Sequence, residues 1–100
     1  MRVLVVEDEP DVLNAVAAFL REEGFYVDTA ANGEDGLFKA ITWEYDAILL
    51  DVMLPDMDGY QVLHTLRTDA STAHIPVIFI SGMDRPEDLA RGLRASQKGA

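Results

Sequence analysis

The sequence predicts an α/β fold in which a parallel sheet is covered by helices on both faces. Three short runs, at 2–6, 47–50 and 77–80, are almost wholly apolar and rich in β-branched residues. Strands of this kind are buried on both faces, as is typical of parallel sheets. A segment with helical spacing of apolar residues follows each run, and a fourth strand candidate lies at 26–29. The resulting order, βαβαβαβα, favours a single α/β domain over residues 1–100.

The first strand–helix unit has clear boundaries. Residues 2–6 form the strand, and an acidic stretch ends it. Pro10 suits the first turn of a helix, and apolar residues then recur at helical spacing as far as Leu20. Gly24 occupies the position at which helices commonly end, so we expect the helix to stop there.

The second unit is weaker. After the short strand at 26–29, an Asn-Gly pair at 32–33 interrupts the chain. Three apolar residues then mark the buried side of a short helix: Leu37, Ala40 and Ile41. Gly36 lies within this stripe and lowers the helix propensity of the segment.

The third unit contains the most distinctive loop. The strand at 47–50 ends in Asp51, and a loop rich in Pro, Asp and Gly follows at 54–59. We interpret the acids at 56 and 58 as turn residues around Gly59. Apolar residues at 62, 63 and 66 then predict the third helix.

The fourth unit begins at Pro76, which is tolerated at the start of a strand. After the strand at 77–80, residues 84–88 combine a capping Asp, a Pro and two acids, which is typical of a helix N-terminus. Two leucines provide the core contacts of this helix, Leu89 and Leu93. Residues 94–100 show no clear period, so we expect no regular element there.

Composition excludes several classes of protein. The chain has 18 acidic and 8 basic residues, a formal net charge of −10. Duplex DNA binding needs a cationic face for phosphate contacts, so we expect no direct binding of nucleic acid. The absence of Cys excludes disulfides and thiolate metal sites, and it fits the reducing cytoplasm. No apolar run is long enough for a membrane span.

Polar residues follow the strand ends, where ligands bind in open parallel sheets. The first strand ends in Glu7 and Asp8, the third in Asp51 and the fourth in Ser81. Any one of them could instead be a cap or turn residue. As a set, they predict an all-oxygen site for a hard divalent cation, Mg²⁺ or similar, with Mn²⁺ as a second candidate. A carboxylate beside such an ion can act as a nucleophile toward a phosphoryl group.

Three segments carry a resemblance to a known family: 3–10 with the acidic pair, 46–60 with the motif Leu-Pro-Asp-Met-Asp-Gly, and 75–82 with the strand that precedes Ser81. Over residues 2–95 the chain resembles a two-component response-regulator receiver domain of the CheY-like superfamily. The resemblance implies a flavodoxin-like, doubly wound parallel sheet with strand order 2-1-3-4-5.

The resemblance also implies a role for each site residue. Asp51 is the phosphoacceptor, taking a phosphoryl group from the phosphohistidine of a histidine kinase or a phosphotransfer protein. Glu7, Asp8 and Asp51 hold Mg²⁺, together with the backbone carbonyl of Met53. Ser81 hydrogen-bonds a phosphoryl oxygen and reorients on phosphorylation. The domain is then a cytoplasmic signalling switch that changes a protein–protein surface, and not a turnover enzyme.

The sequence departs from the family after its fourth helix. A receiver has a fifth strand that ends in Lys, whereas residues 94–100 contain no apolar run. Lys98 follows a helix, so we interpret it as a solvated tail residue. We therefore expect a (βα)4 remainder of a (βα)5 receiver, with strand order 2-1-3-4. The fourth strand is then an exposed edge, where a homodimer could form by strand pairing or by an exchanged element.

Two other functions fit part of the pattern. Without the Lys, the chain could be a receiver-like interaction module that is not phosphorylated and acts through protein contacts alone. An aspartyl phosphatase is less favoured, because that chemistry commonly uses a second acid two residues after the nucleophile, where this chain has Met53.

Overall fold

The computed structural model describes residues 1–81 and 84–98. Its centre is a four-stranded parallel sheet in the order β2-β1-β3-β4, which confirms the predicted α/β fold and strand order. The strands run close to the predicted bounds: β1 (Arg2–Val6), β2 (Tyr26–Ala30), β3 (Ala47–Asp51) and β4 (Val77–Ile80).

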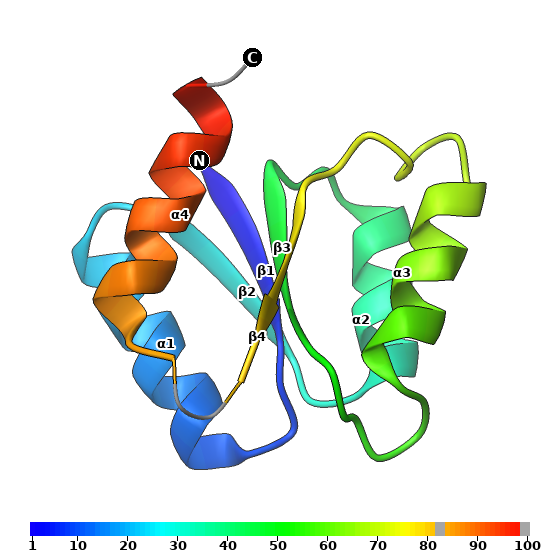
Figure 1. Cartoon of the computed structure of the whole chain (residues 1–100), viewed down its shortest axis with the longest axis horizontal. Helices are drawn as coiled ribbons and strands as arrows, with labels where there is room; N and C mark the ends of the chain where they lie inside the picture. Colours follow the sequence, from blue (N-terminus) through cyan, green and yellow to red (C-terminus); the bar gives the residue numbers. More distant parts are fainter. Residues whose placement is uncertain (82–83, 99–100) are drawn as a thin grey trace.

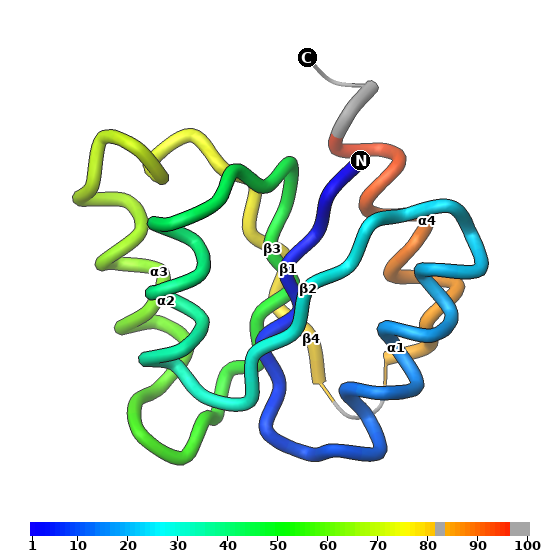
Figure 2. Tube along the Cα trace, turned by 180° about the vertical axis from the view of Figure 1, so that it is seen from behind, coloured from blue at the N-terminus to red at the C-terminus, as the bar shows by residue number. Residues whose placement is uncertain are grey.

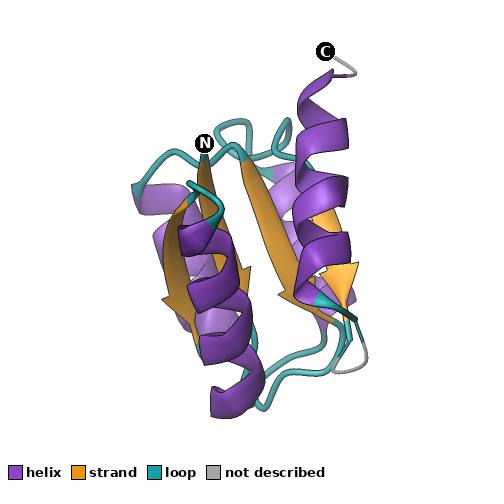
Figure 3. Ribbon diagram, turned by 90° about the vertical axis from the view of Figure 1, so that its left-hand side faces the viewer, coloured by secondary structure: helices purple, strands orange, loops and turns teal. Residues whose placement is uncertain are grey.

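Four helices cover the sheet on both faces. They are α1 (Pro10–Glu22), α2 (Gly33–Thr42), α3 (Gly59–Thr68) and α4 (Pro86–Lys98). Figure 1 shows α1 and α4 on one side of the sheet and α2 and α3 on the other, and the view from behind in Figure 2 agrees. Figure 3 shows the strands as a layer between helices. The loops that leave β1 and β3 at their carboxyl ends lie at the bottom of Figure 1.

The core divides into two layers because neighbouring strand residues point to opposite faces. In β1, Val3 and Val5 join the cluster beneath α1 and α4, whereas Leu4 and Val6 join the cluster beneath α2 and α3. All four side chains are at most 1% exposed. The apolar runs that predicted a doubly covered sheet therefore fill both layers.

Two helices differ from expectation. In α2, Ala40 is buried but Ile41 is 52% exposed, so the predicted apolar stripe is narrower than expected. Gly36 is buried against β1, and a side chain there would clash, because an added Cβ would lie 2.9 Å from a methyl carbon of Val6. Helix α4 continues to Lys98, although the sequence beyond Leu93 predicts no regular element.

The extension of α4 has a tertiary cause. Arg94 Nη2 lies 2.9 Å from a carboxylate oxygen of Glu23, at the end of α1. The Arg94 guanidinium also stacks over Phe25, with its central carbon 5.5 Å from the ring centroid. These contacts hold the C-terminal turns of α4 where local periodicity is weak. Helix α1 ends just before Gly24, as predicted, and Gly24 has a φ of 95°, which glycine adopts readily.

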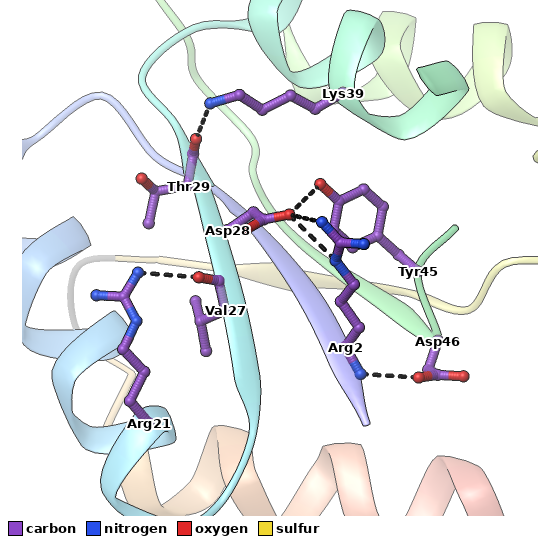
Figure 4. A network of polar contacts seen from close by, with 8 residues as sticks. All are labelled: Arg2, Arg21, Val27, Asp28, Thr29, Lys39, Tyr45 and Asp46. Atoms are coloured by element: carbon purple, nitrogen blue, oxygen red, sulfur yellow. Dashed lines mark hydrogen bonds and ion pairs between the residues drawn. The ribbon is translucent and has the colours of Figure 1, made fainter. Parts of the chain in front are cut away.

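The two edges of the sheet differ in their backbone hydrogen bonds. On β2, the carbonyl of Val27 accepts a hydrogen bond from Arg21 Nη2, and the carbonyl of Thr29 accepts one from Lys39 Nζ (Figure 4). Within the described residues, no side chain forms a hydrogen bond to the backbone of β4. Side chains therefore cover part of the β2 edge, whereas the β4 edge lacks this protection.

Across the described ranges, none of the helices combines the length and hydropathy needed to cross a membrane.

Candidate functional site

The register of the sheet brings the predicted site residues to one edge. Val6 pairs with Leu50, so Glu7 and Asp51 lie side by side at the ends of β1 and β3. Asp51 in turn pairs with Ile80, the residue before Ser81. The site is therefore built at the carboxyl ends of three adjacent strands, as the sequence predicts.

Three carboxylates form a compact cluster at this edge. One oxygen from each of Glu7, Asp8 and Asp51 can be chosen so that the three lie within 4.8 Å of one another. Within the described chain, none of the three is in an ion pair with Lys, Arg or His. Three oxygen donors without a protein cation suit a hard divalent ion, so the residues present fit Mg²⁺.

Glu7 is the most buried member of the cluster. It is 3% exposed, and its backbone N–H donates to the carbonyl of Ala30 at 3.0 Å. Burial, followed by the negative charges of Asp51 and Asp8, raises the pKa of Glu7 to about 7. A hydrogen bond of 3.0 Å from the backbone N–H of Glu9 to Glu7 Oε1 acts in the opposite direction. The cluster thus holds a carboxylate whose charge is costly until a cation compensates it.

Asp51 is fixed by the loop that follows β3. Its Oδ1 accepts a hydrogen bond of 3.3 Å from the backbone N–H of Met53, whose side chain is 78% exposed. The N–H of Gly59 donates to the carbonyl of Val52 at 2.6 Å. A Cβ at Gly59 would lie 2.5 Å from the backbone oxygen of Asp51, so only glycine allows this approach. The loop backbone at Gly59 therefore packs directly against the backbone of Asp51.

Ser81 follows β4 at the carboxyl end of the sheet, as expected, and is exposed to solvent. Its backbone N–H donates to Asp84 Oδ2 at 2.7 Å, and the N–H of Asp84 returns a bond of 3.1 Å to the Ser81 carbonyl. The Asp84 carboxylate therefore bonds the residue that follows β4, whereas the sequence predicts it as a helix cap.

Sequence reasoning underestimates one acid near the site. Asp58, interpreted from the sequence as a turn residue, caps α3 through a reciprocal pair of hydrogen bonds with Gln61. Asp56 instead accepts hydrogen bonds of 2.8 Å from the N–H groups of Gly33 and Glu34, at the start of α2. These bonds lower the pKa of Asp56. The contact joins residues 22 and 23 positions apart, so no short-range pattern could reveal it.

Comparison with known proteins adds independent information. The family profile of the response regulator receiver domain matches residues 3–100. The cell cycle response regulator CtrA from Brucella ovis, and likewise from Brucella abortus, is 44% identical over 93 residues. That alignment includes 93% of this chain and 39% of the relative, so the chain spans about two fifths of the relatives' length.

Solved structures agree in fold. The chemotaxis response regulator CheY4 of Vibrio cholerae is 30% identical, with a TM-score of 0.78 over 87% of this chain and 72% of that one. The receiver domain of a sensor histidine kinase from Pseudomonas aeruginosa, with a magnesium ion coordinated in its active site cleft, is 26% identical, with a TM-score of 0.87 over 94% of each chain. The regulator TrrA from Thermotoga maritima, in complex with Mg²⁺-BeF, is 29% identical, with a TM-score of 0.70 over 92% of this chain and 97% of that one.

Proposed function

This chain belongs to the response-regulator receiver family, and on that premise we propose that Asp51 is its phosphoacceptor. Receiver domains are signalling switches whose general role is to accept a phosphoryl group. The observation that supports Asp51 is its place in the carboxylate cluster, where it ends the central strand β3 and stays accessible, whereas Glu7 is buried.

The proposed step is a phosphoryl transfer from a phosphohistidine. A carboxylate oxygen of Asp51 forms a bond to phosphorus while the phosphorus–nitrogen bond breaks. The electron pair of that bond goes to the imidazole nitrogen, and the product is an acyl phosphate on Asp51. The donor is a histidine kinase or a phosphotransfer protein, which contacts Asp51 at the carboxyl end of the sheet.

Glu7 and Asp8 are proposed as the remaining carboxylate ligands of Mg²⁺, with Mn²⁺ as a substitute. Asp8 is exposed and Glu7 is buried, so the two acids offer oxygens from the rim and the floor of the same cluster. The backbone carbonyl of Met53 is proposed as a further ligand. Bound Mg²⁺ supplies positive charge that offsets the charge of the transferring phosphoryl group.

Ser81 is proposed to donate its hydroxyl to a phosphoryl oxygen on Asp51. Its position beyond Ile80, the strand partner of Asp51, supports this role. Reorientation of Ser81 would then pass the phosphorylated state to Asp84, which bonds the Ser81 backbone, and to α4 beyond it, which changes a protein–protein surface. The proposal includes a cytoplasmic location, where receiver domains typically act.

Intact-mass measurement tests this function. The protein is incubated with Mg²⁺ and acetyl phosphate, beside an EDTA control, Asp51→Asn and the matched variant Asp28→Asn. Asp28 lies in the middle of β2 and is not part of the carboxylate cluster, so its variant controls for loss of one carboxylate. We expect one phosphoryl adduct on the wild type and on Asp28→Asn, and none with EDTA or Asp51→Asn.

A folded wild-type protein without an adduct would contradict the proposal. It would favour the alternative function, an interaction module that acts through protein contacts without phosphorylation. An adduct that persists in Asp51→Asn would place the phosphoacceptor elsewhere. Steady release of phosphate from a phosphomonoester would instead favour a phosphatase.

We also propose that residues 1–100 belong to one receiver domain and that the β4 edge of this chain pairs with a second copy. The unprotected backbone of β4, in contrast to the covered β2 edge, supports pairing there. Light scattering over a range of concentrations tests this proposal. We expect a mass that rises from one chain to two; a single-chain mass throughout would contradict it.

A further inference from the structure

A cavity lies at the amino end of the sheet, away from the carboxylate cluster. Its volume is about 520 Å³, within the range of pockets that hold small ligands or side chains. It lies between the end of α2, the start of β3 and the loop that leads to β4. The phosphoryl site proposed above contributes none of its lining residues.

The wall of this cavity continues into an exposed apolar patch. Phe38, Ile41 and Trp43 are 61%, 52% and 43% exposed, and they follow one another along the end of α2. The rings of Phe38 and Trp43 pack edge to face, with centroids 6.3 Å apart. Large apolar side chains gathered beside a cavity are typical of an interaction site, whereas single exposed ones are ordinary.

The charge of the cavity is negative. Two carboxylates line it, Glu44 and Asp46, and its lining contains no Lys or Arg. Asp46 accepts a hydrogen bond of 2.8 Å from the backbone N–H of Arg2. The Glu44 side chain is exposed and makes no hydrogen bond or ion pair with the residues that the structure describes. Glu44 is therefore available to a basic group from outside.

The floor of the cavity is held in place by the network in Figure 4. Tyr45 lines the cavity, is 5% exposed, and donates its hydroxyl hydrogen to Asp28 Oδ2 at 2.6 Å. Arg2 binds the same carboxylate oxygen at 2.8 Å and stacks over the Tyr45 ring at 5.2 Å. A preformed floor lowers the ordering cost of binding.

We propose that this cavity binds a short segment of a partner protein that carries an apolar side chain next to a basic one. The apolar side chain enters between Ile41 and Trp43, and the basic side chain reaches Glu44. The acidic rim without Lys or Arg is the reason for choosing a basic partner over a neutral or acidic one. This inference goes beyond the phosphoryl-transfer function and does not depend on it.

Fluorescence of Trp43 tests the proposal, because this is the only tryptophan of the chain. The probe is the peptide acetyl-Ala-Lys-Leu-Leu-Arg-Ala-amide, compared with analogues in which Gln or Glu replaces both basic residues. We expect a saturable change with the basic peptide, weaker binding of the Gln analogue and none of the Glu analogue. Glu44→Gln should weaken binding of the basic peptide about two- to fivefold, the effect of one exposed ion pair.

The matched control is Glu22→Gln, which removes one exposed carboxylate on α1 and changes the net charge equally. It should leave the affinity unchanged. The proposal is overturned if the folded protein shows no saturable change, if Glu22→Gln weakens binding as much as Glu44→Gln, or if the Gln analogue binds as well as the basic peptide. A fluorescence change on raising the protein concentration alone that the basic peptide abolishes would identify a second copy as the occupant of the cavity and would also overturn the proposal.

Discussion

The two ends of the sheet use the same kind of residue in opposite ways. Toward the amino end, Arg2 and Tyr45 donate hydrogen bonds to Asp28 in the middle of β2, and these contacts lower the pKa of Asp28. At the carboxyl end, the Glu7 carboxylate is buried beside the negative charges of Asp51 and Asp8. It accepts one backbone hydrogen bond from Glu9, and its pKa is raised.

This difference separates carboxylates that have cationic or hydroxyl partners from carboxylates that have none. A carboxylate with protein donors contributes to stability, because its charge is compensated in the folded state. A cluster of carboxylates without a protein cation costs free energy, which a divalent ion can recover when it binds. Acidic composition alone does not distinguish the two ends; the partners of each carboxylate do.

Of the changes that test this difference between the two ends, addition of Mg²⁺ should change the free energy of unfolding most. A ligand at 100 times its dissociation constant stabilises the protein that binds it by about 2.7 kcal/mol. We therefore expect the free energy of unfolding of the wild type to rise by about that amount, as measured by urea denaturation with and without Mg²⁺. Asp28→Asn should respond like the wild type and Asp51→Asn much less; equal responses of all three would show that the ion does not bind at the carboxylate cluster.

Removal of the Tyr45 hydroxyl should give an intermediate effect at the amino end. Tyr45→Phe keeps the buried ring but loses the bond of 2.6 Å to Asp28, so we expect a loss of about 1 kcal/mol in the free energy of unfolding. Tyr60→Phe is the control, because Tyr60 is 61% exposed and its hydroxyl has no hydrogen bond among the residues described. If both variants unfold alike, the amino-end network adds nothing to stability.

Protonation of Asp28 at low pH should give the smallest change in stability. Since the pKa of Asp28 is lowered in the folded state, its contribution is fully present above its usual pKa of 3.8 and is lost as the pH falls through the lowered value. The Asp28 side chain is 37% exposed, so we expect less than about 1 kcal/mol. Thermal unfolding below pH 4 should depend less steeply on pH in Asp28→Asn than in the wild type. Identical dependence of thermal unfolding on pH in the two proteins would contradict a stabilising interaction of Asp28 with Arg2 and Tyr45.

Much of the fold could be predicted because its signals are local. Strands that are apolar on both faces predicted a doubly covered parallel sheet, and residues 2–6 and 77–80 form strands at the predicted bounds. The exposure of Ile41 could not be predicted, since helical spacing says which residues share a face but not how far the neighbouring layer extends. The length of α4 depends on Arg94 reaching Glu23, which is 71 positions away.

The site could be located because parallel strands all end at one edge. That rule brought Glu7, Asp8 and Asp51 together before any distance was known, and the cluster confirms their proximity. The burial of Glu7 and the hydrogen bonds that α2 donates to Asp56 depend on tertiary packing, so the sequence could not indicate them. The roles of these residues in phosphoryl transfer stay predictions.

The most direct test of the contrast is the free energy of unfolding of Asp51→Asn and Asp28→Asn, measured in metal-free buffer well above the pKa of Glu7, where its carboxylate is ionised. Two like charges about 4 Å apart repel by between about 1 kcal/mol in bulk water and about 4 kcal/mol near a protein surface. We therefore expect Asp51→Asn to be more stable than the wild type by about 1 kcal/mol or more, and Asp28→Asn to be less stable. A loss of stability in both variants would contradict the account, because Asp51 would then be a structural acid like Asp28.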